Sequence, residues 1–108
     1  MPLEVEILAA AVSMRRAGQA TFHGFGLAQT MREQRESRSL TAHGTLYKAL
    51  GRLEGLGLLT STWEDVAAAE SRPRRRLYEV TGQGIRAADQ ARADQAAGRL
   101  PRLAPGPA

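Results

Sequence analysis

The side chains best suited to bind a ligand are hydroxyl and cationic groups at helical spacing in the middle of the chain. Thr45, Lys48 and Arg52 fall within about 60° of one another when successive residues are placed about 100° apart around a helix. Four more cations form a short basic run: Arg72, Arg74, Arg75 and Arg76. Side chains of these types donate hydrogen bonds to DNA phosphates and base edges. The two groups therefore predict a nucleic-acid contact surface.

The segment that carries the first group also has a separate apolar face. Leu46, Leu50 and Leu53 form a stripe whose centre lies roughly 130° around the helix from the Thr45, Lys48 and Arg52 face. One face is thus suited to a protein core and the other to solvent or a ligand. We predict a helix from about residue 42 to residue 57, with Thr41 as its N-cap and Gly57 at its end.

The charge of the chain is compatible with DNA binding but does not decide it. Of 108 residues, 15 are basic and 11 are acidic, which gives a net charge of +4. A basic excess indicates nucleic-acid binding only when the cations gather on one face, and otherwise describes a solvated surface. The length and the 43% of apolar residues predict one globular domain, and the absence of cysteine excludes disulfides and thiolate metal sites.

The periodicity of the apolar residues predicts the other elements. Helices are expected over residues 3–16 and 24–36, a turn over 37–42, strands over 58–63 and 75–80 with a mobile basic loop between them, and a last helix over about 84–98. That last helix, which Thr81 caps, is mostly alanine and has Ile85 as its only large aliphatic residue. Three of the five prolines lie in residues 99–108, which we expect to be disordered.

This order of elements predicts the fold class: mainly α with a small β-hairpin, in a winged helix-turn-helix arrangement. Such a fold has three helices, a two-stranded wing and here a C-terminal helix. The third helix would enter the major groove, and the wing would lie along the backbone or in the minor groove. We expect residues 1–81 to bind DNA, 82–98 to form a dimerisation helix and 99–108 to be the tail.

Three stretches of the chain resemble the PadR family of bacterial regulators. They are GTLYKALGRLEGLGLLTSTW at residues 44–63, RRRLYEVTGQG at 74–84 and HGF at 23–25. The matches extend over about residues 3–90 in the family's order and spacing, and they are specific in combination. The short chain resembles the compact subfamily, which has a single C-terminal helix.

The resemblance implies a homodimer that represses transcription and is released from DNA by a small-molecule or other stress signal. The sequence leaves open whether the effector is an organic molecule or a metal. It places Thr45, Tyr47, Lys48 and Arg52 on the recognition helix, and Arg74, Arg75 and Arg76 on the wing. It places the dimer contact on the first and last helices. The candidate dimer residues are Leu3, Ile7, Leu8, Ala11, Ile85 and Ala88.

Three residues depart from the family pattern. Gly51 stands where a long basic or polar residue is usual, Gly55 where an acidic one is common, and Leu77 where an aromatic one is common. Each glycine costs a helix roughly 1 kcal/mol relative to alanine. We therefore expect the recognition helix to be less stable before DNA holds it.

Several residues admit two interpretations. The Tyr47 hydroxyl either donates to a phosphate or is the solvent-exposed end of an aromatic side chain in the core. Trp63 either packs to anchor its strand or offers its ring as a platform for a ligand. Arg74, Arg75 and Arg76 alternate faces along a strand, so only some of them can point at DNA. His23 and His43 could join a metal site, but a structural role is the simpler interpretation, and we predict no metal and no cofactor.

Other functions are less consistent with the sequence. It has no glycine-rich phosphate loop, no Gly-x-Ser-x-Gly motif and no His-x-x-x-His pair, so we predict no enzymatic activity. Without a signal peptide or a long apolar run, we expect a cytoplasmic protein with no membrane partner. The leading hypothesis is a repressor of an inverted-repeat operator. The alternatives are a winged-helix protein-protein adaptor and a non-specific nucleoid-associated protein.

Overall fold

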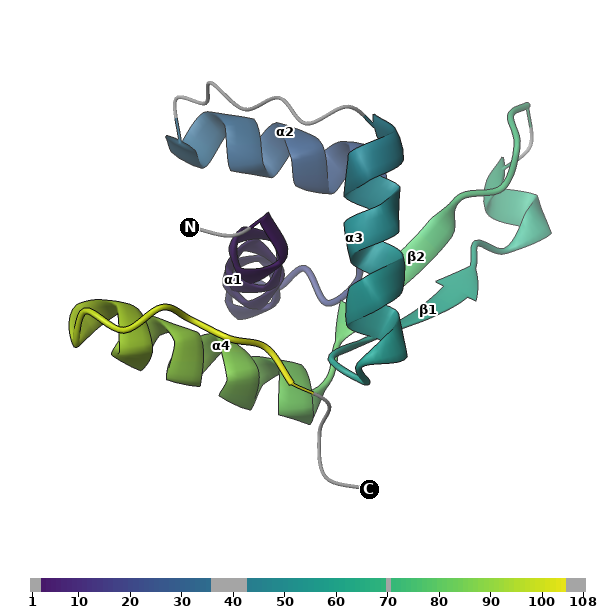
Figure 1. Cartoon of the computed structure of the whole chain (residues 1–108). Helices are drawn as coiled ribbons and strands as arrows, with labels where there is room; N and C mark the ends of the chain where they lie inside the picture. The colour runs from purple at the N-terminus through teal and green to yellow at the C-terminus, as the bar shows by residue number, and fades with distance from the viewer. Residues whose placement is uncertain (1–2, 36–42, 70, 105–108) are drawn as a thin grey trace.

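The computed structural model describes residues 3–35, 43–69 and 71–104. Its elements in chain order are α1 (Leu3–Arg16), α2 (Gly24–Arg35), α3 (His43–Gly55), β1 (Leu59–Trp63), a short 3-10 helix η1 (Val66–Ala69), β2 (Arg76–Val80) and α4 (Gly82–Ala96). In Figure 1, α1 lies between α2 and α4, and the hairpin projects away from the helices beyond α3. Four helices with one antiparallel hairpin confirm the predicted fold class.

The hairpin is tied to the helices through the segment that precedes α2. Its strands pair in antiparallel register from Leu59 with Val80 to Trp63 with Arg76. On the other edge of β2, the Phe22 amide donates to the Tyr78 carbonyl at 3.0 Å, and the Tyr78 amide donates to the Phe22 carbonyl at 2.8 Å. The two rings also stack, with centroids 5.8 Å apart. The wing therefore begins as a rigid extension of the helical body.

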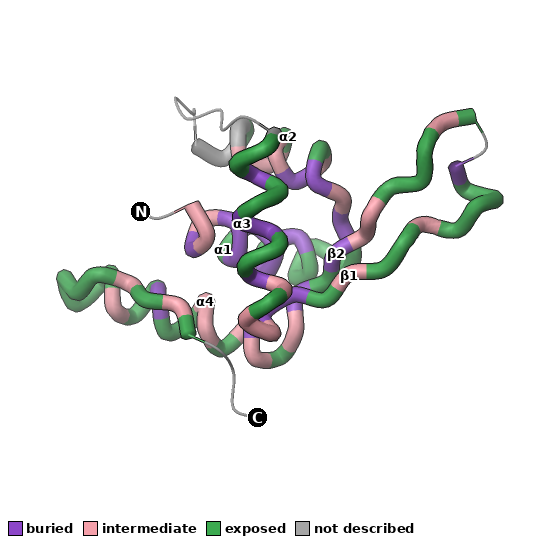
Figure 2. Tube along the Cα trace, turned by 45° about the vertical axis from the view of Figure 1, so that its right-hand side comes forward, coloured by how far each residue is buried: buried purple, intermediate pink, exposed green. Residues whose placement is uncertain are grey.

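The core forms where α1 meets α2, α3 and the start of the hairpin, and the outer hairpin and most of α4 are exposed (Figure 2). Leu50 and Leu53 of the predicted apolar stripe have no exposed surface, and Leu46 is 3% exposed. Because the same cluster takes up one face of α1, Ile7, Leu8 and Ala11 are also buried inside the protomer. This differs from our expectation that these three residues contact a dimer partner, whereas Leu3, Ile85 and Ala88 keep some exposed surface.

Helix α3 ends in the way that the glycine at position 57 predicts. Gly57 has a φ of 78°, in the left-handed region that favours glycine. Its amide donates to the Glu54 carbonyl and the Leu58 amide donates to the Leu53 carbonyl, both at 3.0 Å. These two bonds form a Schellman motif, which satisfies carbonyls of the last turn and turns the chain into β1. The helix proper ends at Gly55, two residues before the predicted end.

The C-terminal part differs from the sequence-based expectation in two ways. Thr81 caps α4 as predicted, since its Oγ1 accepts from the Gly84 amide at 2.9 Å, but the helix begins at Gly82. The chain after α4 is placed as far as residue 104: Arg99 Nη2 lies 3.0 Å from Asp94 Oδ1, and Leu103 packs against the core. An ion pair and an apolar contact thus hold residues that we expected to be disordered.

Some predicted features lie outside the described residues. They are the turn over 37–42, the Thr41 cap, residue 36 at the end of the second helix and the last four residues of the tail. Among the described helices, none is long and apolar enough to cross a membrane.

Candidate nucleic-acid interface

The exposed face of α3 carries the predicted recognition residues. Lys48 lies near the centre of this face, together with three glycines at positions 44, 51 and 55. Thr45 and Arg52 border it on one side and Tyr47 on the other, and all three are exposed. A Cβ added at any of the three glycines would meet no atom within 4 Å. The backbone is therefore exposed at the centre of the face, and the Lys48 side chain projects from it.

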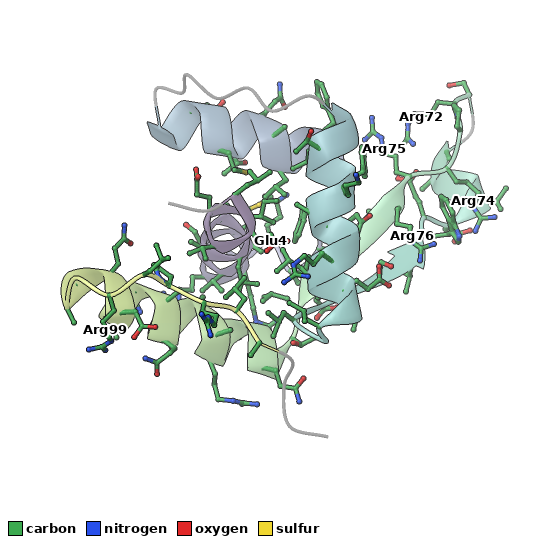
Figure 3. All side chains as sticks on the ribbon, viewed as in Figure 1. Glu4, Arg72, Arg74, Arg75, Arg76 and Arg99 are labelled. Carbon is green, nitrogen blue, oxygen red and sulfur yellow. The ribbon has the colours of Figure 1, made fainter. Side chains whose placement is uncertain are left out.

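On the α1 side of this face, Arg52 is paired with an acidic residue. Its Nε lies 2.8 Å from Glu4 Oε2, in the first turn of α1. Figure 3 shows Glu4 on the side of α1 that faces α3. A shallow cavity of about 310 Å³ lies here, lined by Thr45, Lys48 and Arg52 as well as by Glu4. The predicted cationic face thus includes one carboxylate that the sequence pattern did not reveal.

In the wing, Glu64 organises the basic run. Arg72 Nη1 and Nη2 donate to its two carboxylate oxygens at 2.7 and 3.0 Å, and Arg74 Nε donates to its backbone carbonyl at 2.9 Å. The Arg75 amide also donates to the Glu64 carboxylate at 3.3 Å. The hydrogen bond from Arg72 is the main cause that lowers the pKa of Glu64 to about 2. The loop that we predicted to be mobile therefore has internal bonds at its base.

Arg76, at the start of β2, is held by the ring of Trp63 and by a residue at the end of α3. The Arg76 guanidinium carbon lies 5.0 Å from the centroid of the Trp63 ring, a cation-π distance. Its Nε donates to Ser61 Oγ at 3.0 Å, and its Nη2 lies 3.8 Å from Glu54 Oε2. Arg72 and Arg76 are thus engaged within the protomer, whereas Arg74 and Arg75 are more exposed (Figure 3).

Tyr47 is positioned by a glycine at the start of α2. A Cβ added to Gly24 would lie 2.6 Å from the Tyr47 hydroxyl oxygen and 2.7 Å from the adjoining ring carbon. Only a residue without a side chain lets the tyrosine ring lie this close to α2. Tyr47 combines the two interpretations of its role. Its ring packs on α2, and 45% of the residue is still exposed to solvent.

His23 joins the start of α2 to the wing. Its Nδ1 accepts from the Gly26 amide at 3.1 Å, and its Nε2 lies 3.1 Å from Arg75 Nη1. A neutral imidazole has one acceptor nitrogen and can accept from only one of these donors at a time, while a protonated imidazole accepts from neither. Burial, followed by the charge of Arg75, lowers the pKa of His23 below its usual value of 6.5.

We expect the contacts of the neutral His23 ring to make the stability of the protein depend on pH. Because the pKa of His23 is lowered in the folded state, its contribution is complete above pH 6.5 and is lost as the pH falls through the folded-state pKa. In His23→Gln, an amide oxygen can accept from the Gly26 amide without titrating. Thermal unfolding between about pH 5 and 7.5, above the carboxylate range, should show a smaller decrease for this variant than for wild type. Parallel curves of melting temperature against pH for the two proteins would contradict this role of His23.

The structure brings the predicted DNA residues to one side of α3 and to the neighbouring wing. It also identifies three carboxylates that sequence reasoning missed, Glu4, Glu54 and Glu64, which hold Arg52, Arg76 and Arg72. No periodic pattern marks them. Glu4 and Glu54 pair with arginines that are distant along the chain, and the pair of Glu64 with Arg72, 8 positions later, depends on how the wing loop folds back. Among the described residues, no three histidine or acidic side chains gather as metal ligands, and the side chain of His43 is outside that set.

Comparisons with known proteins agree with this geometry. The family model "Transcriptional regulator PadR-like family" matches residues 15–90. A transcriptional regulator from Clostridium thermocellum is similar, with 21% identity over 89% of this chain and 84% of that one and a TM-score of 0.71. A PadR family regulator from Clostridium difficile has 23% identity over 85% and 86% of the two chains, with a TM-score of 0.66.

A PadR family regulator from Eggerthella lenta has 22% identity over 84% of this chain and 71% of that one, with a TM-score of 0.64. At these identities the solved structures support the fold, and the family model supports the relationship by sequence. No curated protein matches the chain.

Proposed function

This chain belongs to the PadR-like family of transcriptional regulators, and from this premise we propose that it is a sequence-specific DNA-binding repressor that acts as a homodimer. The family relationship that the motifs predicted is confirmed, and it places the chain among regulators rather than enzymes, as we also predicted. The observation that carries the proposal is the exposed face of α3, where Lys48 stands between Thr45, Arg52 and Tyr47 beside an arginine-bearing hairpin.

Each part of this surface has a distinct task in the proposed complex. Lys48 and Thr45 read base edges in the major groove, because they lie in the first half of the helix that enters it. The three exposed glycines let the backbone of α3 approach the DNA closely. Arg74 and Arg75 contact phosphates from the wing, which adds affinity and salt dependence but little sequence preference.

We assign residues 1–81 to DNA binding and 82–98 to dimerisation, as the domain prediction has it. Ile7, Leu8 and Ala11 are buried within the protomer, and Leu3, Ile85 and Ala88 pack partly against the same core. The proposed dimer contact therefore uses the exposed side of α4 and the surface that Leu3, Ile85 and Ala88 keep. The sequence of α4 offers alanines for close helix packing rather than large apolar side chains.

We expect the purified protein to be a dimer in solution at tens of micromolar. Sedimentation analysis over a range of concentrations measures this directly. As a test of the interface, Ala93→Glu should shift the equilibrium towards monomers, because it places a charge on the exposed side of α4. A wild-type protein that remains monomeric at these concentrations would contradict the dimer assignment.

The experiment that tests the function is selection of bound duplexes from a random DNA library with the full chain. We expect enrichment of an inverted repeat whose half-sites lie about one helical turn, or 34 Å, apart. Footprinting of the selected sequence then gives the spacing. Enrichment of no motif at near-physiological salt would contradict sequence specificity and favour a general DNA-coating role.

The pairing of Glu4 with Arg52 gives a further expectation. Glu4→Gln frees the Arg52 guanidinium for a phosphate contact, and it removes a negative charge beside the recognition face. The affinity for random-sequence DNA should rise, and the slope of log K against log salt should steepen by about 0.9 for one added contact. Anisotropy titrations at several salt concentrations measure both.

Glu79→Gln on β2 is the control, since it also frees one arginine, Arg15, and changes the net charge equally, but lies outside the cavity between α1 and α3. If both variants change the slope by the same amount, the effect comes from the overall charge and the role assigned to Glu4 is wrong.

A further inference from the structure

The hollow between α3 and the wing is lined mainly by aromatic and basic side chains. Its volume is about 420 Å³, and it opens where the start of α2, α3 and the hairpin meet. Four aromatic side chains line it, Phe25, Tyr47, Trp63 and Tyr78. Phe25 is 52% exposed, Tyr47 45% and Trp63 56%, and these are three of the five large apolar residues that are exposed in the described part of the chain. Exposed rings that converge on one concavity are typical of a binding site.

The charged residues of the hollow are all basic. Arg74, Arg75 and Arg76 contribute to its walls together with His23, and no carboxylate of the described residues does. The acidic partners of these arginines, Glu54 and Glu64, are not among the lining residues. Glu64 accepts from Arg74 Nε with its backbone carbonyl and from the Arg75 amide with its carboxylate, and Glu54 lies 3.8 Å from Arg76. An occupant is therefore attracted by cations and meets no repulsive carboxylate at the walls.

We propose that this hollow, which we call the wing pocket, binds a planar aromatic anion. The rings supply flat surfaces for stacking, and the guanidinium groups supply charge-assisted hydrogen bonds to a sulfonate, carboxylate or phosphate group. The volume lies within the usual range for sites of small organic molecules. Of the two interpretations of Trp63 that the sequence left open, this proposal takes the ligand platform.

Duplex DNA can interact with the arginines that line the wing pocket but not with its exposed aromatic rings. Its phosphates can pair with Arg74 and Arg75, but its bases are stacked and paired inside the helix and offer no free ring to Phe25 or Trp63. The ligand and DNA thus compete for the shared arginines and for Tyr47, while Phe25 and Trp63 stack on the ligand alone. In this respect the inference rests on the proposed function: a bound aromatic anion would release the operator by direct competition at the DNA surface.

Trp63 makes the binding directly observable, because it is the only tryptophan in the chain. The probe is 4-nitrobenzenesulfonate, a flat anion whose nitro group quenches tryptophan emission on contact. Two matched probes separate the ring from the charge: 4-nitrobenzamide has the ring without the charge, and cyclohexanesulfonate has the charge without an aromatic ring. We expect saturable quenching by the first probe, with a dissociation constant about tenfold or more below those of the other two, measured by quenching and by displacement.

Variants locate the binding in the wing pocket. Phe25→Ala and Arg75→Gln should each raise the dissociation constant of 4-nitrobenzenesulfonate about tenfold or more, since one removes a stacking surface and the other a cation. Arg102→Gln, in the tail after α4, removes the same charge outside the pocket and should leave this dissociation constant unchanged. The proposal is overturned if no saturable quenching occurs at millimolar probe, if the three probes bind equally, or if neither pocket variant weakens binding.

Competition is measured with the operator selected above. The apparent dissociation constant for DNA should rise with probe concentration as one plus the ratio of probe to its own dissociation constant. Saturation of the pocket without any effect on DNA binding overturns the competitive mechanism. If wild-type protein binds no specific DNA, the proposed function fails, while the quenching experiment still decides whether the pocket binds its ligand.

Discussion

Replacing Gly84 with alanine should destabilise this protein by roughly 1–3 kcal/mol, the usual range for inserting an atom into a packed site. Gly84 is buried in the first turn of α4, and an added Cβ would overlap the backbone carbonyl oxygen of Leu58 and lie 2.7 Å from Val80 Cγ2. The Leu58 carbonyl cannot move freely, because it also accepts from the Thr81 amide at 3.1 Å. For a domain of this size, the melting temperature should fall by about 4–8 °C for each kcal/mol.

Gly51→Ala is the matched control, with the opposite sign expected. The same substitution in α3 meets no atom within 4 Å and improves helix propensity by about 1 kcal/mol. Thermal and urea unfolding of the two variants measure both effects. A Gly84→Ala protein as stable as wild type would contradict the close packing of α4 on the hairpin, and a destabilised Gly51→Ala protein would show that this face is not open.

The second large effect concerns DNA binding by the recognition helix. Replacing Lys48 and Arg52 with alanine removes both long cations from the exposed face of α3. The contact of Lys48 is worth roughly 1–3 kcal/mol, and the ion pair with Glu4 makes the share of Arg52 smaller. We expect the affinity for the selected operator to fall by about tenfold for each 1.4 kcal/mol lost. Arg99→Ala with Arg102→Ala, in the tail after α4, is a control with the same loss of charge. Equal effects of the two double variants would place the DNA surface elsewhere.

Lys48 also allows a direct contact test, since it is the only lysine in the chain. An amine-reactive reagent modifies only its side chain and the N-terminus, and mass spectrometry separates the two. Bound operator should protect Lys48 from modification, and unchanged reactivity with the operator bound would contradict its place in the groove.

Much of the fold could be predicted because its signals are local. Leu46, Leu50 and Leu53 repeat at helical spacing, Gly57 permits the left-handed turn that ends α3, and Thr81 caps the next helix. Each of these features depends on residues within one or two turns. The same local pattern separated the apolar face of α3 from the face that carries Lys48.

The partners of the cationic residues could not be predicted in this way. Glu4 and Arg52 are 48 positions apart in the sequence, and their ion pair depends on how α1 crosses α3. The burial of Ile7 and Leu8 depends likewise on tertiary packing, since an apolar stripe on a helix has the same pattern whether it faces its own core or a partner. The wing pocket needs three elements at once, and a sequence does not reveal that Phe25 and Trp63 remain exposed.

The most direct test of the proposed function is equilibrium binding of the full chain to its selected operator and to a shuffled duplex of the same length and composition. At near-physiological salt, we expect the operator to bind about a thousandfold or more tightly than the shuffled duplex, as specific DNA-binding proteins do. Equal affinities for the two duplexes would contradict sequence-specific regulation by this chain.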